Sequence, residues 1–171
     1  MVESLYLTAF PPEERRSVER MRALAESGRL CVAVALRSDT DADATRRFCG
    51  FITWWDFGSF FYGEHLAILP ECRCGGVGGK VIDALTAVAQ GRMTVIEVEL
   101  PTGDLERRRI DFYRRHGFEV ADFAYTQPPY EAGFEGVPMH IMTHGGRLTA
   151  ERFARVRDRI YAEVYGVATV G

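Results

Sequence analysis

Residues 66–80 read LAILPECRCGGVGGK. Here an apolar run typical of a strand stops at Pro70, a glycine-dense turn follows, and an amphipathic helix begins. Glycine permits positive φ and the close approach of a ligand, while the free amides and partial positive charge of a helix N-terminus attract anions. The stretch therefore predicts a strand–turn–helix unit that binds a pyrophosphate, with Arg73 and Lys80 adding positive charge.

Two familiar phosphate-binding turns differ from this stretch. A Walker loop needs Ser or Thr after its Gly-Lys pair, but Gly79 and Lys80 are followed by Val81, so no hydroxyl is available for magnesium. A dinucleotide-binding fingerprint normally follows the first strand of its domain, whereas this turn follows several predicted strands. A glycine-rich turn that binds nothing is the remaining alternative.

The rest of the chain predicts an α+β fold, an α/β sandwich around one mostly antiparallel central sheet. Before the turn we expect a helix opened by Pro11 and Pro12 and ended by Gly28, then a meander of strands at 30–36, 48–57 and 62–69 with a polar hairpin tip at 38–46. After it we expect a strand at 94–100, a helix that Asp104 caps and that runs to His116, strands at 118–125 and 139–143, and a helix capped by Thr149. These elements make one domain over 1–147, extended by a C-terminal helix in 148–171.

A more specific pattern lies within and after the turn. Arg73, Gly76 and Gly78 spell Arg-x-x-Gly-x-Gly behind a strand that ends in proline, and residues 112–119, FYRRHGFE, match the ending FY-x-x-x-GF-E. In these motifs, and in element order from about residue 5 to residue 142, the chain resembles the GNAT superfamily of acyl-coenzyme A-dependent acyltransferases. The resemblance implies a GNAT-like mixed sheet and an enzyme that moves an acetyl group from acetyl-CoA to a primary amine by direct attack.

The resemblance also implies which residues hold the co-substrate, acetyl-CoA. The turn from Arg73 to Gly79 would cradle the pyrophosphate, and main-chain groups of the preceding strand would bind the pantetheine arm. The implied contacts are Leu66, Ala67, Ile68, Arg73, Cys74, Gly75, Gly76, Val77, Gly78, Gly79, Lys80 and Tyr113. Many family members carry an asparagine where this chain reads PTGDLE at 101–106, so one pantetheine-side hydrogen bond is not carried over.

Direct transfer needs a group that removes a proton from the amine and a donor for the departing thiolate. By resemblance Tyr113 is that donor, and a phenol titrates near ~10, close to a thiol. For the base the sequence favours Glu64 beside the cofactor strand, with Glu97 and Glu99 on the next strand as alternatives. Alternation places Glu97 and Glu99 on one face and sends His65 to the face opposite Glu64. All three carboxylates could instead be solvated surface groups.

Composition and charge limit the kinds of partner and the cellular compartment that we expect. The 171 residues are 47% hydrophobic with a formal net charge of -3, which suits one packed core and tolerates a cationic acceptor, but gives no attraction to nucleic acid or an anionic membrane. The chain has neither a signal-like start nor a run of ~20 apolar residues, so we expect a cytoplasmic protein. Its four cysteines lack CxxC pairs and its histidines lack ligand partners, so no metal is expected.

Some alternatives stay open from the sequence. A GNAT-fold module that binds acyl-CoA without catalysis fits the same turn, and so does transfer of a larger acyl group. The apolar face of the last helix, with Phe153, Val156 and Ile160, could pack on its own sheet or on a second subunit, which leaves a homodimer open. The loop at 126–138 is a substrate lid or a plain connection. Some of the chain's clustered aromatic residues could line an acceptor pocket, namely Trp54, Trp55, Phe57, Phe60, Phe61, Tyr62, Tyr125 and Tyr130. No motif identifies the acceptor, the acyl preference or the pathway.

Overall fold

A computed structural model of the chain describes residues 1–38 and 46–167. Within these residues, seven strands form one sheet in the order β1-β2-β3-β4-β7-β5, with β6 paired to β7. The strands are β1 Cys31–Arg37, β2 Arg47–Asp56, β3 Phe60–Ile68, β4 Met93–Glu99, β5 Glu119–Val120, β6 Tyr125–Gln127 and β7 Val137–His144. In this described part the pairings are antiparallel, except that β3 and β4 are parallel. The predicted mostly antiparallel α+β sandwich is confirmed.

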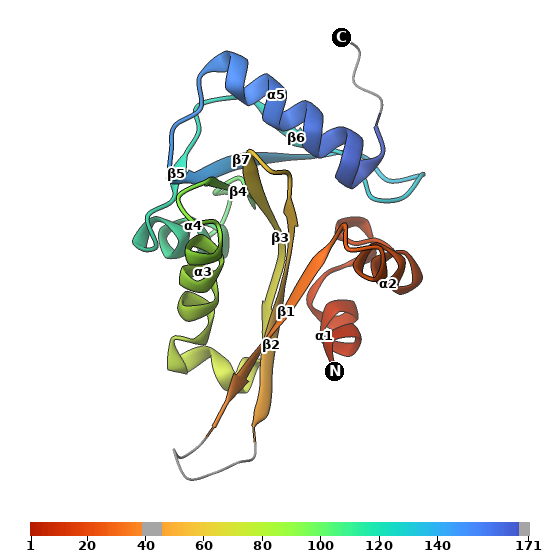
Figure 1. Ribbon diagram of the computed structural model, residues 1–171, viewed down its shortest axis with the longest axis vertical. Helices are drawn as coiled ribbons and strands as arrows, with labels where there is room; N and C mark the ends of the chain where they lie inside the picture. Colours follow the sequence, from red (N-terminus) through yellow and green to blue (C-terminus); the bar gives the residue numbers. More distant parts are fainter. Residues whose placement is uncertain (39–45, 168–171) are drawn as a thin grey trace.

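Helices cover both faces of the sheet (Figure 1). α1 Val2–Ala9, α2 Val18–Glu26 and α5 Ala150–Ile160 lie on one face, and α3 Val77–Val88 and α4 Asp104–Arg115 lie on the other. Their buried side chains form one apolar cluster on each face, so the sheet is the middle layer of three. No helix in the described ranges is long and apolar enough to cross a membrane.

The last helix packs on its own sheet. Phe153, Val156 and Ile160 recur at helical spacing and are buried in the same cluster as side chains of α1 and α2. The Thr149 side chain accepts a hydrogen bond from the Arg152 amide at 3.3 Å, so the predicted N-cap is confirmed. A five-residue π-helix, Tyr161–Tyr165, continues α5 and ends at Gly166, which has a left-handed backbone.

The start of the chain differs from the prediction. Pro12–Glu14 form a short 3-10 turn, and α2 begins later, at Val18. Ser17 sets this start because its side chain accepts a hydrogen bond from the Arg20 amide at 3.2 Å, which satisfies a free donor of the first turn. The sequence analysis also missed α1, which has a weak apolar pattern and no side-chain cap.

Two later predictions also change. The N-cap of α4 is Gly103 rather than Asp104, whose carboxylate pairs with Arg107 at 3.0 Å instead. The strand expected at 118–125 is two strands, β5 and β6, because they pair with separate parts of β7. The hairpin tip expected at 38–46 falls on residues 39–45, which lie outside the described residues.

The sheet opens between its two central strands. β3 and β4 pair only from Phe60–Gly63 to Met93–Ile96, yet β3 runs on to Ile68 and β4 to Glu99. On their outer sides both strands stay paired to the end, β3 with β2 and β4 with β7. Beyond the last shared pair, the inner edges of the two strands therefore offer backbone donors and acceptors that no strand uses.

A β-bulge at Glu64 reorients the side chains beside this opening. Thr53 of β2 pairs with His65, but Trp54 pairs with Gly63, so Glu64 is an extra residue without an opposite partner. Glu64 and His65 consequently share one side of the sheet, where His65 Nδ1 lies 3.6 Å from Glu64 Oε2. The prediction that these two side chains point to opposite faces is wrong, because the strand is not regular at this position.

Candidate active site

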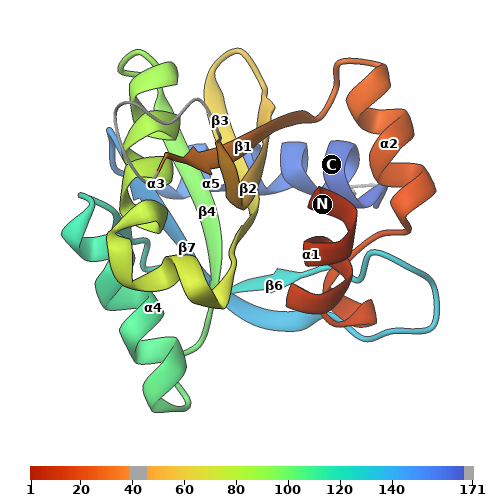
Figure 2. The same ribbon diagram turned by 90° about the horizontal axis from the view of Figure 1, so that it is seen from below.

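A cleft of about 730 Å³ lies where β3 and β4 diverge. Its walls come from the ends of these two strands, the start of α3, one side of α4, the segment after α1, and the loop after β6. Figure 2 shows α3 and α4 on one side of this end of the sheet and α1 on the other. Nine predicted site residues line the cleft together: Glu64, Leu66, Ala67, Ile68, Arg73, Gly76, Gly78, Gly79 and Tyr113.

The N-terminus of α3 presents unused backbone donors at one end of the cleft. Gly76 has a left-handed backbone (φ 68°), which ends the 3-10 turn Pro70–Gly75 and lets α3 start at Val77. No side chain within residues 1–38 and 46–167 caps the helix, and the Lys80 amide bonds to the Gly76 carbonyl at 3.1 Å. The amides that precede Lys80 have no intrahelical partner, so this end of the cleft suits an anion.

The remaining residues predicted for the pyrophosphate divide between two places. Arg73 lines the cleft and donates from Nε to the Ile68 carbonyl at 3.1 Å, which holds its guanidinium beside the end of β3. Three others line a separate, mostly apolar groove between α3 and β1, namely Gly75, Val77 and Lys80. Cys74 is exposed and lines neither the cleft nor the groove. Arg73 is therefore better placed than Lys80 for a phosphate in the cleft.

Tyr113 belongs to α4 and lines the cleft. Its half-buried ring packs against Phe112 and Phe118, with ring centroids 5.1 and 5.7 Å away. Burial raises the pKa of Tyr113 to about 12, so the phenol keeps its proton at neutral pH. No hydrogen bond engages its hydroxyl within the part of the chain that the structure describes, which leaves the proton available to a ligand.

Glu64 is fully engaged by its neighbours. Its side chain is 0% exposed and accepts two hydrogen bonds from Arg16, at 3.0 and 2.5 Å, with further donors from Trp55 Nε1 and the Tyr130 hydroxyl, each at 3.1 Å. Burial alone would raise the pKa of Glu64, but Arg16 and His65 outweigh it and hold the pKa well below its usual range. The base role of Glu64 stays a prediction, and this pairing makes it a weak proton acceptor.

Glu97 is a carboxylate in the same cleft without an arginine or lysine partner in the described ranges. It accepts hydrogen bonds from the Tyr125 hydroxyl, from Gln127 Nε2 at 2.8 Å and from the Tyr165 hydroxyl at 2.7 Å. Burial raises the pKa of Glu97, although these hydrogen bonds oppose the shift. A half-buried carboxylate with a raised pKa is a better proton acceptor than Glu64 at neutral pH.

Glu99 lies two residues further along β4 and also lines the cleft. Its carboxylate forms an ion pair with Arg109 of α4. Because Arg109 occupies it, Glu99 bridges β4 and α4 at the cleft, and its carboxylate is less free than that of Glu97 to contact a ligand.

Comparison with known families agrees with this geometry. The family described as the acetyltransferase (GNAT) domain matches residues 22–120, more than half of the chain. This chain belongs to the GNAT acetyltransferase family. The matched range holds the α3 turn, both diverging strands and Tyr113.

Solved GNAT structures share the fold. A protein of Bacteroides thetaiotaomicron assigned to the GNAT family is 39% identical, with a TM-score of 0.84 over 97% of this chain and 90% of that one. Arabidopsis thaliana NAA60 in complex with acetyl-CoA has a TM-score of 0.62 at 14% identity, covering 83% of this chain and 89% of its own. A Bacillus subtilis acetyltransferase in complex with CoA has a TM-score of 0.54 at 15% identity, covering 84% and 92%. None of the curated protein sequences matches the chain.

Sequence reasoning missed three polar residues of this GNAT site, which lie outside the matched range: Arg16, Gln127 and Tyr165. Arg16 stands in the run EERR at 13–16, where nothing distinguishes a buried arginine from a solvated one. Gln127 belongs to no motif. The pair Tyr161 and Tyr165 on a predicted amphipathic helix was the one available signal of a polar function in the tail. Tyr130 lines the cleft, as its place in the loop suggested.

Proposed function

We propose that this GNAT protein transfers an acetyl group from acetyl-CoA to a primary amine by direct attack. One observation carries the proposal: a single cleft joins the uncapped N-terminus of α3 to a protonated Tyr113 hydroxyl and to the Glu97 carboxylate. A module that only binds acyl-CoA would need the first of these features and neither of the other two. We treat residues 148–171 as part of the same domain as 1–147, because α5 and the turn after it contribute to one core and one site.

The chain's own groups fit acetyl-CoA. The free amides of α3 and the Arg73 guanidinium suit a pyrophosphate, because both attract a negatively charged group. The inner edge of β3 from Leu66 to Ile68, unpaired on the β4 side, offers main-chain partners to the amides of a pantetheine arm. When bound, acetyl-CoA supplies the activated acyl group, and solved structures with this fold hold acetyl-CoA or CoA.

In the proposed mechanism two residues handle the protons. Glu97 accepts the proton of the attacking amine while the amine nitrogen bonds to the acetyl carbon. Tyr113 donates its proton to sulfur as the carbon–sulfur bond breaks, so a neutral thiol leaves. The resulting phenolate regains a proton from solvent and Glu97 loses one, which restores both groups. The transfer requires the Glu97 carboxylate to be ionised and the Tyr113 phenol to be protonated at the same pH.

Replacing Arg73 with glutamate should weaken acetyl-CoA binding about ten- to a hundredfold, because a charge-assisted contact is lost and a repulsive charge is placed beside the phosphates. Calorimetric titration measures the dissociation constant. The matched control is Arg155→Glu, the same charge reversal on the exposed face of α5, which should leave binding unchanged. Wild-type protein that fails to bind acetyl-CoA would overturn the proposed function.

Replacing Tyr113 with phenylalanine should leave acetyl-CoA affinity near that of the wild type but lower thiol release about 10²- to 10⁴-fold, because only the proton donor is removed. Thiol release is measured with a panel of primary amines at saturating acetyl-CoA. Equal release by the variant and the wild type would contradict the acid role. Wild-type protein that binds acetyl-CoA but releases no thiol with any amine of the panel supports the binding-module alternative.

A further inference from the structure

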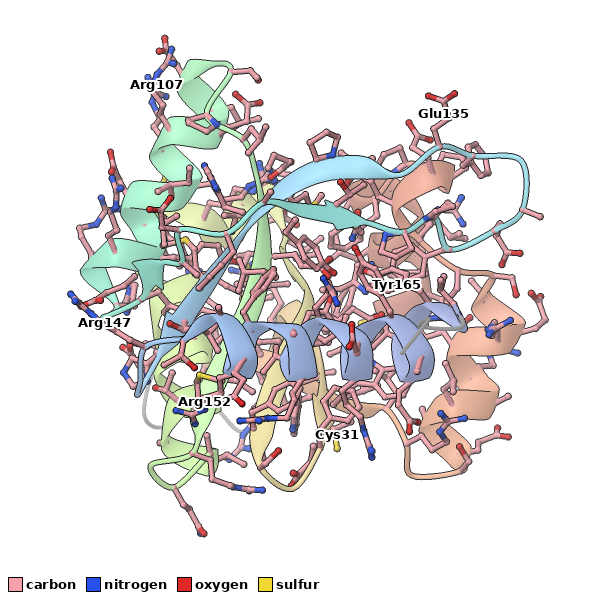
Figure 3. All side chains as sticks on the ribbon, turned by 90° about the horizontal axis from the view of Figure 1, so that it is seen from above. Cys31, Arg107, Glu135, Arg147, Arg152 and Tyr165 are labelled. Carbon is pink, nitrogen blue, oxygen red and sulfur yellow. The ribbon has the colours of Figure 1, made fainter. Side chains whose placement is uncertain are left out.

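The turn that follows α5 contacts Glu97, one of the residues that line the cleft. The π-helix Tyr161–Tyr165 leaves Tyr165 almost fully buried, and Figure 3 shows this residue between the end of α5 and β6. The Tyr165 hydroxyl donates to Glu97 Oε2 at 2.7 Å, accepts from Gln127 Nε2 at 2.8 Å and lies 3.2 Å from the Tyr62 hydroxyl. Its ring packs on Tyr130 with centroids 4.9 Å apart. A segment beyond the matched GNAT range thus touches the proposed base.

We propose that Tyr165 is a positioning residue, whose hydroxyl fixes the orientation of the Glu97 carboxylate and favours its ionised form. The C-terminal turn is then a working part of the active site rather than an appendage. The inference rests on the proposed base role of Glu97, and the two ideas fail by different measurements.

The number of protons on each group decides which group donates in each hydrogen bond around Glu97 and Tyr165. A phenol has one proton to donate, and Tyr165 gives its proton to Glu97, so Tyr62 must be the donor in the contact between the two hydroxyls. The amide nitrogen of Gln127 has two protons, one for Glu97 at 2.8 Å and one for Tyr165 at 2.8 Å. Tyr125 donates to the other oxygen of Glu97. Oε2 of Glu97 therefore accepts from two donors and Oε1 from one, and all three contacts favour the ionised form of the carboxylate.

The same turn is anchored independently of Glu97. Val164 is buried, and its carbonyl accepts a hydrogen bond from Arg16 at 3.4 Å. At the surface, Glu163 pairs with Arg29 at 2.7 Å. The wider backbone of a π-helix is often found at functional sites, and here it brings Val164 and Tyr165 into the core in succession. Tyr165 therefore contacts Glu97 from a turn that is itself anchored to the rest of the protein, and a positioning residue requires such support.

Several elements place polar side chains near Glu97. β3 contributes Tyr62, β6 contributes Tyr125 and Gln127, the following loop contributes Tyr130, and the C-terminal turn contributes Tyr165 through a direct hydrogen bond and Tyr161 without one, while β7 places the apolar Ile141 opposite Glu97. Two other carboxylates that line the cleft, Glu64 and Glu99, are each paired with an arginine. Among these groups Tyr165 is the donor that reaches Glu97 from outside the sheet.

The test compares Tyr165→Phe with Tyr161→Phe. Both substitutions remove one hydroxyl from the same turn, but the Tyr161 hydroxyl donates to the Thr126 carbonyl and does not touch Glu97. Carbon-13 NMR of the glutamate carboxyls follows the titration of Glu97, whose signal is assigned by its loss in Glu97→Gln. We expect Tyr165→Phe to move the midpoint of Glu97 to higher pH and Tyr161→Phe to leave it in place, because only the first removes a donor to the ionised form.

Kinetics give a second readout. With one amine substrate, Tyr165→Phe should move the acid limb of the kcat/KM profile to higher pH, lower kcat/KM at pH 7 about tenfold and leave acetyl-CoA affinity unchanged. Gln127→Met removes the donor that bridges Glu97 and Tyr165, and should shift the NMR midpoint in the same direction.

Each outcome bears on one idea. If both Tyr165→Phe and Gln127→Met leave the NMR midpoint of Glu97 where the wild type has it, the positioning role is wrong. A shifted midpoint together with full activity of Glu97→Gln keeps the contact between the two residues but removes Glu97 as the base. A global loss of fold in Tyr165→Phe would show as a changed thermal transition, and the Gln127→Met titration then decides the question.

Discussion

Replacing Glu97 with glutamine should lower kcat/KM for acetyl transfer by about 10²- to 10⁴-fold, the usual contribution of a positioned general base. Glutamine keeps the shape of the side chain and can still accept hydrogen bonds through its carbonyl oxygen, but it cannot take up the proton of the amine. Acetyl-CoA affinity should stay near the wild-type value, because the proposed pyrophosphate site lies at the start of α3. Steady-state thiol release and calorimetry measure the two quantities.

The pH dependence of the wild-type enzyme follows from the same group. Burial raises the pKa of Glu97, and the base works only when ionised, so the rate should fall as the pH drops through a midpoint above the ordinary carboxyl range. The matched control is Glu99→Gln, which breaks the pair with Arg109 and should have a smaller effect. If Glu64→Gln abolishes transfer in folded protein while Glu97→Gln does not, the choice of Glu64 made from the sequence stands and ours is wrong.

Replacing Arg16 with methionine should lower the free energy of unfolding by about 3–5 kcal/mol, the typical cost of removing one partner from a buried ion pair. The Arg16 side chain is 1% exposed and that of Glu64 is 0% exposed, so the substitution leaves a buried carboxylate without its counter-charge. The double variant Arg16→Met/Glu64→Gln should recover part of the loss, because it removes the unpaired charge. Urea denaturation measures all three proteins, and a loss below about 1 kcal/mol in the single variant would contradict the account.

The Arg16–Glu64 pair also predicts how the free energy of unfolding changes as the pH falls. The pKa of Glu64 is held well below its unfolded value near 4.5, so the pair stabilises the native state fully above that pH. As the pH falls below that value, the unfolded chain takes up the proton first and the stabilisation declines. Glu64→Gln has no such group, so its free energy of unfolding should fall less steeply between neutral and acidic pH than that of the wild type.

The parts of the site that the sequence predicted are those whose geometry is local. The left-handed turn at Gly76 and the uncapped start of α3 follow from consecutive residues, and Tyr113 stands in a contiguous motif. The same holds for the cap of α5 by Thr149, where a side chain bonds to an amide three residues on. Propensity and spacing suffice where both partners lie within one turn of the backbone.

The parts that the sequence did not predict depend on contacts between distant residues. Arg16 and Glu64 are 48 residues apart, and Glu97 and Tyr165 are 68 residues apart. The bulge at Glu64 added a further error, because a period-two pattern cannot show where an extra residue enters a strand. Our proposal of Glu97 over Glu64 as the base depends on which of them has an arginine partner, and that is a property of the tertiary structure alone.

The split between β3 and β4 also determines how rigid the cleft is. Four residue pairs join the two strands at one end, and beyond them each strand is fastened along its other edge, β3 to β2 and β4 to β7. The protein is in effect two half-sheets sharing a short seam, with a wedge-shaped gap whose width is fixed by strand geometry. Because strand geometry and not loop closure forms this gap, the protein should lose little conformational entropy when a ligand binds in it. The gap between β3 and β4 is therefore a preformed binding site.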